Sequence, residues 1–143
     1  MSRIKIDIPD HFPFYTELEV RITDINYGGH VGNDRFLVYI QEARQQFLAS
    51  KGYTELDVAG NGLIMADAAI RFKREILYGQ SLVIGVLAND FDRMSFDLVY
   101  GIFIKEKDGS KVLAGAAKTN MVYYNYSTHK KVSLSQEVIA TLS

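Results

Sequence analysis

The sequence predicts an α+β fold in which an antiparallel sheet of about five strands wraps around one long central helix. Three observations predict it: apolar residues alternate over residues 15–26, then recur at spacings of three and four, and then alternate again in four later segments. A helix this apolar must be covered by the sheet, because it would be insoluble outside the core. No repeat or linker interrupts the chain, so we expect residues 1–143 to form a single domain.

The first strand and the helix follow each other directly. The segment "YTELEVRITDIN" (15–26) places Leu18, Val20 and Ile22 on one face and charged side chains on the other. Asn33 or Asp34 can cap the helix, and Gly52 can end it. The apolar stripe of the helix comprises Phe36, Tyr39, Ile40, Ala43 and Phe47, and it is widened by Leu37, Val38 and Leu48.

Four strand segments and a short helix complete the pattern. After a polar loop at residues 60–62, the segments "LIMADAAIRFKREI", "SLVIGVLANDF", "SFDLVYGIFIKEK" and "VLAGAAKTNMVYYNY" predict an antiparallel meander, and Asp108–Gly109 is a typical hairpin turn. One face of the first segment carries Ile64, Ala66, Ala68, Ile70 and Phe72. The segment "LSQEVIATLS" has the polar start and apolar spacing of a closing helix.

The composition excludes several classes of function. A net charge of −1 gives no general attraction to nucleic acid, and no cysteine is present, which excludes disulfides, thiolate metal sites and a cysteine nucleophile. We find neither a signal peptide nor an apolar run long enough to span a membrane, so we expect a cytoplasmic protein that does not act on membranes.

The segment "DINYGGHVGN" (24–33) concentrates the groups that could carry chemistry, since it holds one carboxylate, one imidazole, two side-chain amides and three glycines. With its extension to "DINYGGHVGNDRF", the following "QEAR", and the stretches "AAIRFKREILYGQSLVI" and "NMVYYNYSTHKKVSLSQEV", it resembles the hotdog-fold acyl-CoA thioesterases of the 4-hydroxybenzoyl-CoA thioesterase-like family. The resemblance covers nearly all of the chain from about Tyr15 onward.

The resemblance implies hydrolysis of an acyl-CoA or acyl-carrier thioester to free acid and thiol. Coenzyme A would enter as part of the substrate, and neither a metal nor an organic cofactor is implied. It also implies a homodimer or a dimer of dimers, in which sheets join edge to edge and the active sites lie at the subunit boundary. The alanine-rich segment from Ala66 to Ile70 agrees with this, because a long flat strand is an aggregation hazard unless it is paired.

Thioester hydrolysis needs a place for the oxyanion, and the start of the helix offers one. Unpaired N–H groups at a helix start carry partial positive charge. In the resembled family such an amide meets the thioester carbonyl, which points here to the backbone N–H groups of Asn33 or Asp34. An ordinary helix start is the plainer interpretation, and the flanking motif favours the functional one.

Three residues are candidates for the base that would activate water. In the resembled benzoyl-type enzymes the catalytic Asp occupies the second acidic position of the motif, which here is Asn26, and an amide cannot act as a base. Asp24 shares strand parity with Asn26, so we expect both to face the helix, although Asp24 could simply accept backbone N–H bonds. His30 could take up a proton near neutral pH or be a hydrogen-bonded turn residue. Glu42 on the helix is a further carboxylate, for which a structural bond is the better hypothesis.

We therefore expect Asn26 to position water or the thioester, with Asp24 or His30 supplying the proton chemistry. Coenzyme A phosphates would meet Arg71, Lys73 and Arg74, which Arg93 and Lys118 could join. On a regular strand Arg71 and Lys73 share one face and Arg74 the other, so not all three could hold one ligand. Candidates for the acyl pocket are Phe36, Tyr39, Ile64 and Met65.

The sequence leaves two other functions open. One is a non-catalytic acyl-CoA or acyl-carrier binding protein, which Asn26 favours, because a carboxylate-to-amide change would turn a hydrolase into a binder. The other is a hotdog hydratase or dehydratase, which fits less well because the residues match the thioesterase pattern better.

Overall fold

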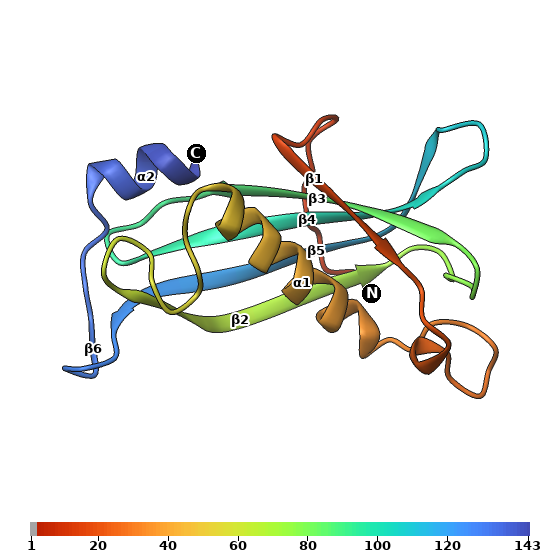
Figure 1. The fold of residues 1–143 in the computed structure, drawn as a ribbon, viewed down its shortest axis with the longest axis horizontal. Coiled ribbons are helices and arrows are strands. Elements are labelled where there is room, and N and C mark those ends of the chain that lie inside the picture. Colours follow the sequence, from red (N-terminus) through yellow and green to blue (C-terminus); the bar gives the residue numbers. More distant parts are fainter. Residues whose placement is uncertain (1–2) are drawn as a thin grey trace.

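An antiparallel sheet with one long helix across its face makes up the fold in the computed structural model, which describes residues 3–143 (Figure 1). This arrangement confirms the predicted α+β fold. The elements are β1 (Phe14–Glu19), the 3₁₀ helix η1 (Ile22–Asp24), α1 (Arg35–Ser50), β2 (Gly62–Phe72), β3 (Ser81–Asn89), β4 (Ser95–Lys105), β5 (Lys111–Asn125), β6 (Lys130–Lys131) and α2 (Gln136–Leu142). None of the helices in residues 3–143 is long and apolar enough to cross a membrane.

The strands lie in the order β1-β3-β4-β5-β2, and the short β6 pairs with β5. Strands β3 to β5 form the predicted meander, but β2 pairs with β5 rather than with its successor β3. The predicted four-strand meander is therefore wrong in its first step. Alternation of apolar residues reveals which face a strand buries, and it carries no information on which strand is its neighbour.

The stripe predicted for α1 is buried against the sheet, and Gly52 ends the helix with a φ of 80°. Leu48 is buried too, whereas Leu37 and Val38 are 43% and 47% exposed. The expectation that the helix is wrapped on several sides thus fails for Leu37 and Val38, because the sheet covers only one face of α1 in a single chain.

Strand β2 contains a bulge between Met65 and Asp67. An extra residue in one strand reverses the alternation of faces beyond it. Leu63 is consequently buried in the core and Ile70 packs on the same core, although they lie seven residues apart. The prediction that Ile64 shares a face with Ile70 and Phe72 is therefore wrong.

The segment before β1 covers the opposite face of the sheet from α1. Phe12 is buried there against β3 and β4, where any side chain at Gly85 or Gly101 would collide with its ring. At the other end of the chain, the hydroxyl of Ser135 accepts a hydrogen bond from the Val138 N–H at the start of α2 (3.1 Å). The predicted closing helix is confirmed.

Candidate active site

Asp24 lies in the connection between β1 and α1, where the predicted strand has already ended at Glu19 and the chain has turned into η1. Its carboxylate is buried and accepts hydrogen bonds from the Tyr39 hydroxyl (2.8 Å) and the Arg21 N–H (2.9 Å). The Arg35 Nε atom lies 3.9 Å away. Burial and the bond to Asp24 raise the pKa of Tyr39, so its hydroxyl stays a donor. Asp24 therefore faces the helix as expected, held by three groups.

Asn26 is exposed, so the expectation that it faces the helix together with Asp24 is wrong. Strand parity does not apply here, because residues 22–24 form a 3₁₀ turn. The Asn26 side-chain oxygen accepts a hydrogen bond from the Gly28 N–H (2.9 Å), and its backbone N–H donates to the carbonyl of His30 (2.9 Å). The amide thus shapes the glycine turn that leads to His30.

His30 is half-buried, and its Nδ1 lies 3.0 Å from the carbonyl oxygen of Val31. A carbonyl can only accept, so Nδ1 carries the hydrogen and Nε2 has a free lone pair in the neutral ring. The nearest ionised group to Nε2 is Glu75, whose Oε1 atom is 3.9 Å away. His30 is therefore held in the tautomer that a general base requires at Nε2.

The start of α1 leaves two backbone donors free. The Gly32 N–H donates to Asp24 and the Arg35 N–H to Gly32. Within residues 3–143, the N–H groups of Asn33 and Asp34 have no hydrogen-bond acceptor. No side-chain cap satisfies them either, since Asp34 makes no capping bond. A helix start with free N–H groups is suited to a developing oxyanion.

Asn33, which carries one of these free donors, borders a cleft of about 240 Å³ between the start of α1 and the segment that follows β2. The cleft is lined by Val31, Asn33, Phe36, Phe72, Lys73, Arg74, Glu75 and Ile76. His30 lies beside it, next to Val31 and Glu75. The cleft thus brings together the predicted oxyanion position at Asn33 and two of the three predicted phosphate ligands, Lys73 and Arg74. These two residues follow Asn33 by about forty positions in the sequence.

The three basic residues predicted to bind phosphate do not all line the first cleft. Strand β2 ends at Phe72, so Lys73 and Arg74 lie beyond it, and their N–H groups both donate to the carbonyl of Ala114 (2.9 and 3.0 Å). Both line the cleft. Lys73 also lines a small cavity beneath the N-terminal segment together with Arg71, Ile6 and Ile8, whereas Arg71 does not line the cleft. Arg71 and Lys73 thus share a cavity, as strand parity predicted. The predicted separation of Lys73 from Arg74 does not hold at the cleft, because both residues lie beyond the end of β2. Neither of the two further candidates lines the cleft: Arg93 bonds Ser133, and Lys118 pairs with Asp97.

Glu42 lies in a second cleft, of about 370 Å³, between β1 and α1. Its carboxylate accepts a hydrogen bond from Gln46 (2.7 Å), which is the structural bond expected for it. Asp24 and Tyr39 line this second cleft as well. The candidate carboxylates are thus separated from the cleft that holds the free N–H groups and the basic pair.

Of the acyl-pocket candidates, Phe36 lines the first cleft, Tyr39 lines the second, and Ile64 and Met65 line neither.

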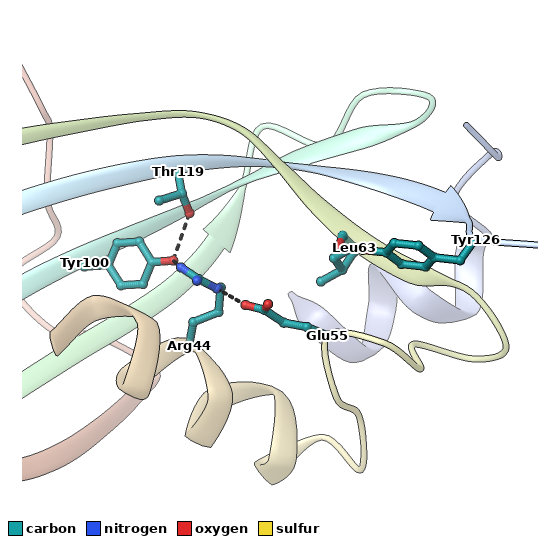
Figure 2. Close-up of polar contacts among 6 residues, drawn as sticks. All are labelled: Arg44, Glu55, Leu63, Tyr100, Thr119 and Tyr126. Carbon is teal, nitrogen blue, oxygen red and sulfur yellow. Dashed lines mark hydrogen bonds and ion pairs between the residues drawn. The ribbon is translucent and has the colours of Figure 1, made fainter. Parts of the chain in front are cut away.

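Two polar features escaped the sequence analysis. Glu75 lines the first cleft and directly follows Lys73 and Arg74 in the sequence. Its place in "FKREI" was the signal that could have revealed it. The other is a buried network around Arg44 (Figure 2), in which the guanidinium binds Glu55 and the Tyr100 hydroxyl, and Tyr100 shares a hydrogen bond with Thr119. None of these four residues lines either cleft. Within residues 3–143, no group of three or more His, Asp or Glu side chains could hold a metal ion.

The family model of the thioesterase-like superfamily matches residues 20–142. A protein of Aquifex aeolicus described as "Putative esterase" is 24% identical over 132 residues, which cover 91% of this chain and 98% of that protein.

Solved structures share the fold. A 1,4-dihydroxy-2-naphthoyl-CoA thioesterase from Synechocystis is 24% identical, with a TM-score of 0.78 over 90% of this chain and 94% of its own. An Asp-to-Asn mutant of 4-hydroxybenzoyl-CoA thioesterase, in complex with 4-hydroxybenzoyl-CoA, is 15% identical, with a TM-score of 0.81 over 91% of this chain and 98% of its own. These likenesses confirm the predicted hotdog fold.

Proposed function

Because the chain belongs to the thioesterase-like superfamily, we propose that it is a hydrolase that converts an acyl-CoA or acyl-carrier thioester to free acid and thiol. The observation that carries the proposal is the first cleft. It is lined by Asn33 at the helix start and by two cations, and an imidazole with an available lone pair lies beside it. A thioesterase needs these three groups to stabilise an oxyanion, activate water and hold the phosphates of its substrate.

In this proposal the thioester carbonyl oxygen lies against the N–H groups of Asn33 and Asp34. Negative charge develops on that oxygen when water attacks, and donors that are already in place stabilise it without reorganisation. The partial positive charge at the start of α1 adds to this effect.

His30 is the base in this proposal. Its Nε2 atom takes a proton from water while the water oxygen bonds to the carbonyl carbon. The tetrahedral intermediate then expels the thiol sulfur as the C–S bond breaks, and His30 returns the proton to that sulfur. Asp24 suits this role less well, because it is buried and occupied by Tyr39 and Arg21, and it lines the other cleft.

Lys73 and Arg74 hold the phosphates of coenzyme A, or of a carrier's phosphopantetheine, at the side of the cleft away from the helix start. Phe36 and Phe72, whose ring centroids are 4.8 Å apart, give the cleft an apolar wall for the acyl or pantetheine chain. The proposed reaction uses neither a metal nor an organic cofactor, and we expect a homodimer or a dimer of dimers.

The alternative is a non-catalytic acyl-CoA or acyl-carrier binding protein. Asn26 favours it, because it stands where the resembled enzymes have their catalytic Asp and its amide is already used in the glycine turn. One structure with this fold is itself an Asp-to-Asn mutant that was captured in complex with an acyl-CoA. A binder would hold acyl-CoA tightly and leave it intact.

Free-thiol release from a panel of short, long and aromatic acyl-CoAs tests the proposal. We expect the wild type to turn over at least one substrate, and His30→Gln to lower kcat by about 10²-fold or more. Asp24→Asn should keep most of the activity, because an amide oxygen can still accept from Tyr39. If the wild type binds acyl-CoA in calorimetry without releasing thiol and Asn26→Asp gains hydrolysis, the protein is a binder. If Asp24→Asn rather than His30→Gln abolishes turnover, Asp24 is the base.

A further inference from the structure

Glu75 is the one carboxylate among the residues that line the first cleft. Its Oε1 atom lies 3.9 Å from His30 Nε2, the ring nitrogen that carries the lone pair. The Glu75 side chain is 72% exposed and that of His30 is 30% exposed, so water reaches both groups. A carboxylate that lines the cleft and an imidazole beside the cleft thus lie 3.9 Å apart.

The backbone sets this pair in place from both sides. The Val31 N–H donates to the carbonyl of Ile76 (2.8 Å), which joins the residue after His30 to the residue after Glu75. The imidazole is in turn tied to Val31 through Nδ1. On the other side, Lys73 and Arg74 are both bonded to Ala114 in β5. These main-chain bonds therefore hold the backbone around Glu75 close to the backbone around His30.

We propose that Glu75 is a positioning residue that holds His30 beside the cleft and stabilises the protonated form of its ring. Glu75 thereby supplies the negative charge that Asn26 cannot. This role rests on the proposed function. When Nε2 takes the proton of the attacking water, the ring becomes a cation, and a carboxylate 3.9 Å away lowers its energy. Lys73 and Arg74 in the same cleft would oppose that cation, so Glu75 also shields His30 from its basic neighbours.

Steady-state thiol release by Glu75→Gln tests the proposal. We expect kcat to fall about tenfold, since the base works without its charge partner. KM should stay unchanged or fall, because the variant removes a negative charge beside the site proposed for the phosphates. Glu75→Asp should recover part of kcat. Glu106→Gln makes the same charge change in the exposed turn between β4 and β5 and should behave as the wild type.

A double variant shows whether Glu75 acts through His30. In the His30→Gln background, Glu75→Gln should cause no further loss of kcat, because there is no imidazole left to position. The proposal is overturned if Glu75→Gln keeps the kcat of an active wild type, or if its loss is the same with and without His30. If the wild type itself releases no thiol from any acyl-CoA, the proposed function fails together with this role.

Discussion

The carboxylate of Asp24 ties three parts of the chain together at the level of single residues. The carboxylate accepts hydrogen bonds from the Tyr39 hydroxyl on α1 and from the Arg21 N–H before η1. The backbone carbonyl of Asp24 accepts another from the Gly32 N–H. These bonds fix the path of the chain from β1 to the start of α1. The geometry of the free N–H groups at Asn33 and Asp34 depends on that path, so Asp24 supports the site without lining the first cleft.

We predict that Tyr39→Phe lowers the free energy of unfolding by about 1–2 kcal/mol, because it leaves a buried carboxylate oxygen with one donor fewer. Urea unfolding at pH 7 measures the effect. Tyr27→Phe is the matched control, since Tyr27 is fully exposed, and it should change stability by less than about 0.5 kcal/mol. Equal effects of the two variants would show that the Tyr39–Asp24 bond contributes nothing.

The same pair predicts a dependence on pH. Burial and Asp24 raise the pKa of Tyr39, so its folded-state pKa lies above that of the unfolded chain. The stability contributed by the neutral hydroxyl is complete below about pH 10, the ordinary tyrosine value, and is lost as the pH rises above it. The stability difference between the wild type and Tyr39→Phe should therefore shrink from pH 9 to pH 11, which urea unfolding at each pH would reveal.

Which residues meet at the site was only partly predictable. The motif at residues 24–33 marks the helix start, and the basic segment after the first long strand marks a candidate phosphate site. That Lys73, Arg74 and Glu75 reach the helix start depends on where β2 ends, and no residue pattern separates Phe72 from Lys73. The orientation of Asp24 was predicted from strand parity, yet it results from a 3₁₀ turn.

At the level of elements, the Arg44 network joins α1 to the sheet and to the loop before β2 (Figure 2). Arg44 is buried, and Glu55 is its only carboxylate partner within residues 3–143. Burial raises the pKa of Tyr100, so its hydroxyl remains neutral and accepts a hydrogen bond from Arg44 (3.2 Å). Tyr126 binds the start of β2 through its hydroxyl, which donates a hydrogen bond to the carbonyl of Leu63 (2.8 Å).

We predict that Glu55→Gln destabilises the fold by about 2–3 kcal/mol, because it leaves a buried guanidinium without its charge partner. This is less than a fully buried pair would lose, since the Glu55 side chain is 29% exposed. Glu17→Gln, which breaks the exposed pair with Lys105, should leave the stability nearly unchanged. Thermal and urea unfolding of both variants provide the comparison, and a Glu55→Gln protein as stable as Glu17→Gln would contradict the prediction.

The elements themselves followed from the sequence more closely than their arrangement. Helix α1 and strands β3, β4 and β5 have strong periodic patterns, and the structure confirms them. Neither the bulge in β2 nor the position of β2 next to β5 was predictable. Ala66 fits a regular strand, and apolar alternation carries no information on which strands pair. The first strand was predicted too long, since Ile22 continues the alternation although it is 65% exposed in η1.

At the scale of the whole molecule, strand β2 stands at an edge of the sheet and pairs with β5 as its only neighbour within the described chain. Along it, residues 65–68 are exposed, and Met65 is 44% exposed. Leu37 and Val38 on α1 are also exposed. An eleven-residue edge strand with apolar side chains is an aggregation hazard in a monomer. The homodimer implied by the resemblance would pair this edge with that of a second copy.

We predict that the protein is a dimer or a larger even-numbered oligomer at micromolar concentration, and that Met65→Lys shifts it toward the monomer. A charged side chain on each copy of β2 would bring like charges together where the two edges meet, and edge lysines oppose such pairing. Leu56→Lys is the control, because Leu56 is 73% exposed in the loop before β2 and should leave the oligomer intact. Light scattering coupled to gel filtration measures the masses. A wild-type monomer, or a Met65→Lys protein with an unchanged mass, would show that β2 is not the interface.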